Sequence, residues 1–371
     1  MKESLEKIKA YIKSNQQKVV LFGGVALVMF IIIIAISIAV KMTGVKITYQ
    51  ELETKLARAA YEYLQEYPNE LPTEGKTTIL SASTLIENKK IKELKKYVKD
   101  ATCTANVQIS YEESSYDYQA YLTCDTYKTE NLLDVIKAKT DKSQTGDGLY
   151  EINNELVFRG ENPNNYVSFA DELWRIVKID KDNRIKIILT ETKDTDIYGT
   201  WDNRYNSEKQ STYGINNYAL SRALLKTNEI YTSKYESLNK YLTKYDLCVG
   251  KRLEESVEKN GSLECSETIK EQMIGLLPAY DFMNASLDGL CTTITSRECQ
   301  NYNYLVNMKN KWWTMTADLK DTYSAFGISY SGVANSDYTS SNSILRYVLA
   351  LNGRVLYESG EGTQENPYVI R

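Results

Sequence analysis

An uncharged apolar segment from Val19 to Val40 constrains this chain more than any other feature. As a helix, its 22 residues would cover roughly 33 Å, close to the thickness of about 30 Å of a bilayer's hydrocarbon core. A buried core helix is one alternative and a cleaved signal peptide is another. A signal peptide has a shorter apolar region and a small-residue cleavage site, whereas Lys41 and Met42 follow this segment. The sequence therefore predicts an uncleaved anchor that crosses a lipid bilayer.

Basic residues and cysteines around the segment predict its orientation. Five lysines precede it and four basic residues follow it closely, which favours a cytoplasmic tail over residues 1–18. All six cysteines follow it, with no C-x-x-C pair, which is typical of a disulfide-permissive exterior. We therefore expect a single-pass protein of the cell membrane with extracellular C-terminal domains. The basic residues are Lys2, Lys7, Lys9, Lys13 and Lys18 before the segment, and Lys41, Lys46, Lys55 and Arg58 after it.

The composition of the 371 residues excludes several classes of function. The chain has no histidine, which rules out Ser-His-Asp and Cys-His catalysis and imidazole metal ligands. Its formal net charge of -4 argues against nucleic-acid binding, which depends on clustered lysine and arginine. We therefore expect no nucleic-acid partner.

The spacing of the cysteines predicts that each pairs with its neighbour, since neighbouring cysteines close the shortest loops. The first pair also follows from strand register. A hairpin with its tip at Glu112 to Ser115 places apolar residues opposite one another on one face and brings Cys103 opposite Cys124. The predicted structural disulfides are Cys103 with Cys124, Cys248 with Cys265, and Cys291 with Cys299.

Two amphipathic helices, Gln50 to Tyr67 and Ser83 to Val98, are expected to pack on this hairpin and form a small α+β stalk domain over residues 46–130. An anchor that runs into a helix on a small antiparallel sheet resembles the layout of pilin-like and pseudopilin proteins. The resemblance is architectural, because the prepilin cleavage signature is missing. A polar linker is predicted over residues 131–147.

The remaining residues, 148–371, read as a second domain of short strands interrupted by helices between Asn216 and Tyr245. A turn at Asp180 to Asn183 places Ile176 opposite Ile187 and Trp174 opposite Leu189. The dipeptide Asn352-Gly353, which lies between two apolar runs, predicts another hairpin with a type I′ turn. The other predicted strands are Asn164 to Phe169, Lys311 to Thr316, Ser324 to Tyr330, Ile344 to Leu351 and Arg354 to Tyr357.

A set of short motifs in this second domain resembles a domain of surface proteins from low-GC Gram-positive bacteria. That domain is similar to a divergent C-type-lectin-like fold, related to formylglycine-generating enzymes and retroelement-diversified lectins. The resemblance implies the fold and an exterior location, but no ligand. One departure is Arg346-Tyr347-Val348, where many relatives carry Arg-Pro-Val. The motifs are Glu172 to Val177, Trp201 to Asn206, Ile274 to Leu277, Trp312 to Thr316, Gly360 to Thr363 and Glu365 to Tyr368.

Paired acidic residues are the main candidates for catalysis or calcium binding, with a solvated loop as the alternative for each pair. The lectin calcium motifs Glu-Pro-Asn and Trp-Asn-Asp do not occur. Formylglycine-generating enzymes use reactive cysteines, and local pairing of all six cysteines leaves none for this chemistry. We therefore predict no catalytic residue, no cofactor and no metal site. The acidic pairs are Asp194 with Asp196, Glu254 with Glu255, and Asp318 with Asp321.

Aromatic residues are the candidates for ligand contact, since exposed tyrosine and tryptophan often mark recognition surfaces. Codon bias of the genome is an alternative explanation for the large number of tyrosines, 30 in the chain. In one strand, Trp312 and Trp313 point to opposite faces, so one is expected in the core and the other near solvent. Arg175 and Arg346 are expected to be structural. The predicted ligand-binding residues are Trp201, Trp312, Trp313, Asp318 and Tyr330.

The sequence thus predicts an α+β protein with one transmembrane helix, a small helix-plus-hairpin domain and a C-type-lectin-like domain. Its predicted function is that of a membrane-anchored extracellular binding or adhesion protein for an unidentified protein or glycan, without enzymatic activity. One alternative is a subunit of a pilin-like or envelope assembly. Another is an extracellular oxidase or hydrolase, which would require a free thiol or a bound metal.

Overall fold

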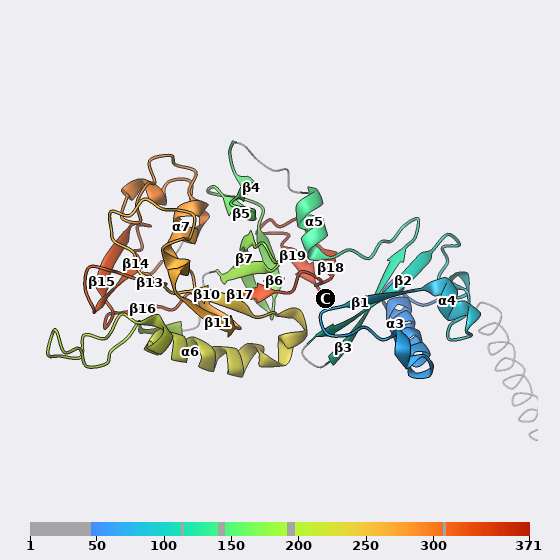
Figure 1. Cartoon of the computed structure of the whole chain (residues 1–371). Coiled ribbons are helices and arrows are strands. Elements are labelled where there is room, and N and C mark those ends of the chain that lie inside the picture. The colour runs from blue at the N-terminus through green and yellow to red at the C-terminus, as the bar shows by residue number, and fades with distance from the viewer. Residues whose placement is uncertain (1–45, 113–114, 140–144, 191–196, 307–308) are drawn as a thin grey trace, which may run out of the picture. The chain divides into compact units, whose positions relative to one another are not determined.

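The computed structural model describes residues 46–112, 115–139, 145–190, 197–306 and 309–371 (Figure 1). The chain divides after Thr129 into two compact units. We call them the small unit, described from residue 46 to Thr129, and the large unit, from Glu130 to Arg371. Each unit has its own hydrophobic core and combines sheets with short helices, as expected for an α+β protein.

The predicted membrane architecture needs correction. In the part of the chain that the structure describes, no helix is long and apolar enough to cross a membrane. This finding contradicts the predicted single transmembrane helix and the predicted location in a cell membrane. The segment Val19 to Val40, on which both predictions depended, lies outside the described residues, as does the predicted tail over residues 1–18.

The small unit consists of a long helix packed on a three-stranded antiparallel sheet of order β1-β2-β3 (Figure 1). Helix α3 begins with a capping box, in which Thr48 and Glu51 satisfy each other's backbone N–H groups. Its buried face includes Leu52, Leu56 and Leu64, which pack with the inward side chains of the sheet. The elements are α3 (Tyr49–Glu66), β1 (Thr77–Ser81), α4 (Ala82–Glu87), β2 (Thr104–Glu112) and β3 (Ser115–Thr123).

The register predicted for the first hairpin is confirmed. Tyr111 lies opposite Tyr116, Val107 opposite Ala120, and the disulfide between Cys103 and Cys124 closes the open end of the hairpin. The predicted second helix is wrong beyond Glu87, because Lys89 has a left-handed φ of 56° and ends α4. Further along the chain, Leu94 is buried and lies in a short 3₁₀ turn. Val98, which follows this turn, is also buried.

The large unit contains two main sheets. One follows the order β12-β17-β8-β7-β6-β19-β18, with the β4–β5 hairpin attached to β7, and the other follows β15-β14-β13-β16-β9. Strands β10 and β11 form a separate ribbon. The strands are β4 (Gly148–Ile152), β5 (Glu155–Arg159), β6 (Tyr166–Phe169), β7 (Glu172–Ile179), β8 (Ile185–Leu189), β9 (Tyr198–Thr200), β10 (Tyr245–Cys248), β11 (Thr268–Gln272), β12 (Ile274–Leu276), β13 (Trp312–Ala317), β14 (Ser324–Ile328), β15 (Ala334–Tyr338), β16 (Asn342–Ile344), β17 (Tyr347–Leu351), β18 (Tyr357–Ser359) and β19 (Tyr368–Ile370).

Helices of the large unit occupy both predicted and unpredicted positions. The predicted helical region contains α6 (Arg222–Ile230), which continues into a π turn and a 3₁₀ turn up to Tyr241. Helix α7 (Ala279–Ala285) is buried along its whole length. Helix α5 (Leu132–Lys139) lies in the segment predicted as a linker. That prediction is wrong for these residues, because Leu132, Val135 and Ile136 are part of the large unit's core.

Strand pairing confirms one predicted hairpin and corrects another. Ile176 lies opposite Ile187 and Trp174 opposite Leu189, as the turn at Asp180 to Asn183 predicts. The hairpin predicted at Asn352-Gly353 is wrong, because β17 already has β8 and β12 as its neighbours and the chain after Gly353 turns away from it. The residues that follow pair instead near the start of α5, where the carbonyl oxygen of Val355 accepts from the backbone N–H of Leu132.

Sequential pairing of all six cysteines is confirmed. In the large unit, Cys248 pairs with Cys265 and Cys291 with Cys299, across separations of 17 and 8 residues. Cys248 is the last residue of β10, and its disulfide joins this strand to the 3₁₀ turn that contains Cys265. Cys299 also lies in a 3₁₀ turn. Disulfide bonds form and persist in oxidising surroundings.

Candidate functional site

The residues predicted to bind a ligand are mostly buried. Trp201, Trp312 and Trp313 are 0% exposed and Asp318 is 1% exposed, whereas Tyr330 is 76% exposed. The expectation that one of the two adjacent tryptophans lies near solvent is wrong, since β13 is covered on both faces. Four of the five residues therefore have no surface from which to contact a ligand, and we assign them structural roles.

Hydrogen bonds show what two of these buried residues do. The indole N–H of Trp201 donates to the carbonyl oxygen of Thr314 at 2.9 Å, which fixes the chain after β9 on the central strand of the sheet. Asp318 accepts from the hydroxyl of Ser336 and from the backbone N–H of Lys320. Both side chains therefore stabilise the second sheet from inside.

Within the described residues, the predicted acidic pairs are not part of a group with metal-ligand spacing. Asp321 uses its carboxylate to accept from the backbone and hydroxyl of Ser324 and from the backbone of Tyr323, which is a turn interaction. Asp194 and Asp196 lie outside the described residues. Within the described chain, the one group with metal-ligand spacing is Asp100 with Cys103 and Cys124, and there the disulfide occupies both sulfurs.

The structural roles predicted for the two arginines are confirmed. Arg346 donates to the carbonyl oxygens of Leu189 and Leu305, both at 2.8 Å, and burial lowers the pKa of its guanidinium to about 9. Arg175 donates to the side chain of Asn165 and lies between the rings of Tyr166 and Tyr304. Both arginine residues are only 3% exposed, and their guanidinium groups hold backbone and rings together inside the large unit.

An open groove of about 320 Å³ lies between helix α6 and strand β9 in the large unit. From α6, Arg222, Leu225, Lys226 and Glu229 line it. Their spacings of three, four and seven residues place them on one side of the helix. In the described part of the chain, the charged ends of these side chains have no hydrogen bond or ion pair.

The opposite side of α6 explains why this row of side chains is free. Ala223, Leu224, Thr227 and Ile230 are buried in the core of the large unit, and Ser221 caps the helix by accepting from the backbone N–H of Leu224. The core therefore fixes the rotation of the helix. Because of that rotation, the charged side chains on the groove side have no partner among the described residues.

Strand β9 and the chain after it supply the other wall of the groove. Tyr198 is 42% exposed, Thr200 and Asn203 contribute polar side chains, and the buried Leu345 lies beneath. At Gly199, a Cβ atom would lie 3.2 Å from the side chain of Leu345, so a larger residue would press on the groove floor. The groove thus combines an exposed ring, two polar side chains, two cations and one carboxylate.

Sequence reasoning missed this groove. The helical spacing of leucines between Asn216 and Tyr245 does not reveal that Leu225 is 51% exposed at the groove. The signal that could have found it is the row Arg222, Leu225, Lys226 and Glu229 on the side of the helix opposite the buried row. The partner strand β9 is only three residues long and carries no comparable pattern.

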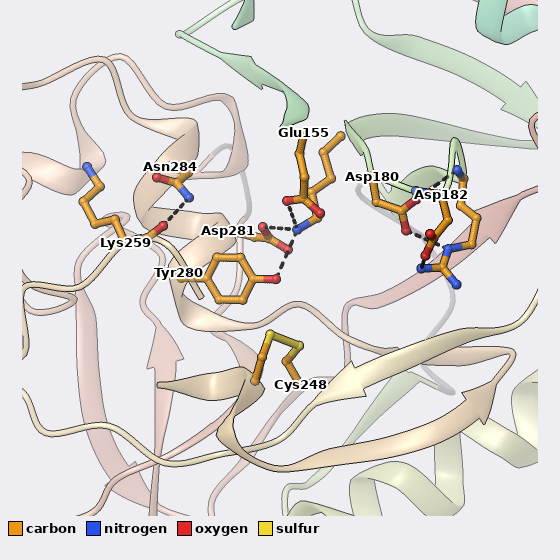
Figure 2. A network of polar contacts seen from close by, with 11 residues as sticks. Glu155, Asp180, Asp182, Cys248, Lys259, Tyr280, Asp281 and Asn284 are labelled. Carbon is orange, nitrogen blue, oxygen red and sulfur yellow. Dashed lines mark hydrogen bonds and ion pairs between the residues drawn. A yellow bond between two sulfur atoms is a disulfide. The ribbon is translucent and has the colours of Figure 1, made fainter. Parts of the chain in front are cut away.

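A second polar site lies inside the large unit, where three side chains converge on one lysine nitrogen (Figure 2). The Nζ atom of Lys178 is 2.9 Å from Oε2 of Glu155, 2.9 Å from Oδ1 of Asp281 and 3.1 Å from the hydroxyl of Tyr280. Burial acts to lower the pKa of Lys178, but the charges of Asp281, Tyr280 and Glu155 outweigh it. The pKa of Lys178 therefore lies well above its ordinary range.

Local structure explains why these groups meet. Val157 of β5 is paired with Lys178 of β7, so Glu155, two residues before Val157, lies diagonally across on the same face. Asp281 comes from helix α7, whose first N–H, at Ala279, donates to the hydroxyl of Thr316 on β13. The helix is thereby fixed with its carboxylate at the lysine.

A small cavity of about 20 Å³ adjoins this cluster and has room for about one water molecule. Lys186, Tyr245, Asp246, Tyr280 and Asp281 are among its lining residues. Nζ of Lys186 lies 4.4 Å from the centre of the Tyr245 ring. Burial, and then repulsion from Lys178, lower the pKa of Lys186 to about 8.

We expect Lys186 to titrate with a midpoint near 8 instead of its ordinary 10.5. Between these values the unfolded chain binds more protons than the folded chain, so the contribution of Lys186 to stability rises with pH across this range. The measurement is an NMR titration of lysine side chains labelled with ¹³C, in which Lys186→Arg identifies the signal. A midpoint close to 10.5 would show that water reaches the ammonium group freely.

Comparisons of the chain with protein-family models, with curated proteins and with solved structures found no match. The resemblance to C-type-lectin-like domains therefore stays a prediction.

Proposed function

We propose that this protein is a non-enzymatic binding protein, and that the groove between α6 and β9 holds an acidic carbohydrate. The observation that carries the proposal is the pair of cations, Arg222 and Lys226, which line an open groove without a partner in the described residues. Exposed cations that the fold does not pair are available to an anionic ligand.

The other groove residues favour a sugar as the carrier of the negative charge. Arginine presents a planar fork that matches a carboxylate, and the ring of Tyr198 offers an apolar face for the C–H groups of a sugar ring. Thr200 and Asn203 provide hydroxyl and amide groups that donate to and accept from sugar hydroxyls.

Two observations support binding over catalysis. In the described residues, Glu229 is the single carboxylate that lines the groove, whereas glycoside hydrolysis generally needs a pair of carboxyl groups. All six cysteines are in disulfides, so the reactive thiol that the oxidase alternative requires has no candidate. The enzyme and assembly-subunit alternatives stay predictions.

We expect the full chain to bind an oligogalacturonate, whose every sugar carries a carboxylate, more tightly than a neutral cello-oligosaccharide of equal length. Replacing Arg222 with alanine should weaken binding by about tenfold to a hundredfold, since a hydrogen bond to a charged group contributes about 1.5–3 kcal/mol. The measurement is titration calorimetry at two salt concentrations, with weaker binding expected at the higher one.

The matched control is Lys320→Ala, which removes an exposed lysine from the turn after β13 and should leave binding unchanged. Equal affinity for both oligosaccharides, or equal affinity of the Arg222→Ala variant and the natural protein, would overturn the proposal. Preferential binding of polyglutamate would assign the groove to acidic peptides instead.

A further inference from the structure

The cluster at Lys178 has a feature that a structural ion pair does not require. Lys178 is 1% exposed and Asp281 is 3% exposed, so an amine and a carboxyl group touch in surroundings from which water is largely excluded. Although their atoms are 2.9 Å apart, the contact does not have hydrogen-bond geometry. Within the described residues, Oδ1 of Asp281 has no hydrogen-bond donor. The nitrogen therefore lies against the carboxyl group of Asp281 without a hydrogen bond to it, while its hydrogen bonds go to Glu155 and Tyr280.

A second carboxylate contacts the same nitrogen from another side (Figure 2). Glu155 accepts a hydrogen bond from Nζ of Lys178 at 2.9 Å, and its side chain is 25% exposed. Glu155 can therefore take a proton from the nitrogen, and it lies on a path from the buried contact to solvent. A buried amine against a carboxyl group, with a base that reaches solvent, is the arrangement that amide formation needs.

From this geometry we propose that Lys178 and Asp281 condense into an intramolecular amide bond, with Glu155 as the proton relay. The amide would join strand β7 to helix α7 independently of the disulfides. This inference does not rest on the proposed carbohydrate groove, which involves none of these residues.

The reaction balances without a further reactant. One proton of the Lys178 ammonium group passes through Glu155 to a carboxylate oxygen of Asp281, and the neutral nitrogen attacks Cγ of the resulting carboxylic acid. The bond from Cγ to the protonated oxygen then breaks, and this oxygen leaves as water with the relayed proton and a second hydrogen from the nitrogen. The third hydrogen stays on the amide nitrogen, and no atom is oxidised or reduced.

Condensation would remove two buried charges from the core of the large unit. A buried ammonium and a buried carboxylate are both costly to remove from water, whereas a neutral amide is much less so. The water that forms can leave along the partly exposed side chain of Glu155.

The test is the intact mass of the full chain after denaturation and reduction of the disulfides. We expect a mass lower by one water molecule than the sequence requires, and a tryptic fragment in which the peptides of Lys178 and Asp281 are joined. The full sequence mass in the natural protein would overturn the proposal. Aspartates before glycine, such as Asp147 and Asp288, can also lose water, so the joined fragment is required.

Three variants make the test specific. Lys178→Arg keeps the positive charge but lacks a condensable amine, and it should restore the full mass. Glu155→Gln keeps a hydrogen-bond acceptor near the nitrogen but removes the base, and it should also restore the mass even if Lys178→Arg does not fold. Lys186→Arg changes the neighbouring lysine and should leave the mass deficit intact. A deficit that persists in Lys178→Arg, or one that disappears in Lys186→Arg, would contradict the assignment.

Discussion

Replacing Glu264 with alanine is expected to lower the free energy of unfolding by about 3–5 kcal/mol, because it leaves a buried arginine without its counter-charge. The side chains of Glu264 and Arg252 are both 0% exposed, and Nη1 of Arg252 lies 2.8 Å from Oε1 of Glu264. The other end of the guanidinium donates to the carbonyl oxygens of Ser256 and Glu258. The measurement is urea-induced unfolding of the oxidised protein, followed by tryptophan fluorescence.

The matched control removes both charges together. Arg252→Met combined with Glu264→Leu should cost much less than Glu264→Ala alone, since apolar residues of similar size often replace a buried ion pair at little cost. The disulfide between Cys248 and Cys265 spans this segment, so its integrity has to be confirmed by mass in every variant. A loss below about 1 kcal/mol for Glu264→Ala would mean that water reaches Arg252 and solvates its charge.

The pH dependence of this pair has a defined sign. Burial raises the pKa of Glu264, and the opposing effect of Arg252 does not fully offset it. Above the ordinary value of 4.5, the folded chain therefore retains a proton that the unfolded chain has released. The contribution of Glu264 to stability consequently falls as pH rises from 4.5 toward the raised pKa of the folded state.

Local sequence patterns predicted those parts of the fold in which neighbours along the chain are also neighbours in space. The hairpin register between Val107 and Ala120 and the sequential disulfides belong to this class, since alternation and loop length decide them. The hairpin at Asn352-Gly353 failed because pairing in the large unit is decided by strands distant in sequence. Two-residue turns with positive φ occur instead at Asn153-Asn154 and at Ala170-Asp171.

Both candidate sites depend on long-range packing, which limits what the sequence alone can predict. The cluster at Lys178 joins side chains from β5, β7 and α7, and no spacing in the chain relates Lys178 to Asp281. To predict the groove, the rotation of α6 about its axis has to be known. That rotation is determined by the buried row Ala223, Leu224, Thr227 and Ile230. The prediction that tryptophans contact a ligand was wrong because residue type does not show whether both faces of the sheet are covered. An aromatic residue in a strand gives the same sequence pattern in either case.

Replacing Trp201 with alanine is expected to destabilise the large unit by about 3–5 kcal/mol, the range for truncating a buried tryptophan. The side chain is 0% exposed, its ring lies 5.5 Å from that of Tyr218, and its N–H is bonded to Thr314. The loss combines a cavity with an unpaired carbonyl oxygen. The measurement is again urea-induced unfolding, with Trp201→Phe as a control that fills much of the cavity and loses less.

Tyr198, three residues earlier, provides the contrast that separates core from ligand contact. It is 42% exposed at the groove, so Tyr198→Ala should change the free energy of unfolding by no more than about 0.5 kcal/mol. The same variant should weaken binding of the oligogalacturonate, because it removes the apolar face against the sugar. If Tyr198→Ala unfolded the protein while Trp201→Ala left its stability intact and abolished binding, the assignment of these two aromatic residues would have to be reversed. If instead Trp201→Ala destabilised the protein and Tyr198→Ala weakened only binding, recognition would belong to the exposed side chain of Tyr198 at the groove.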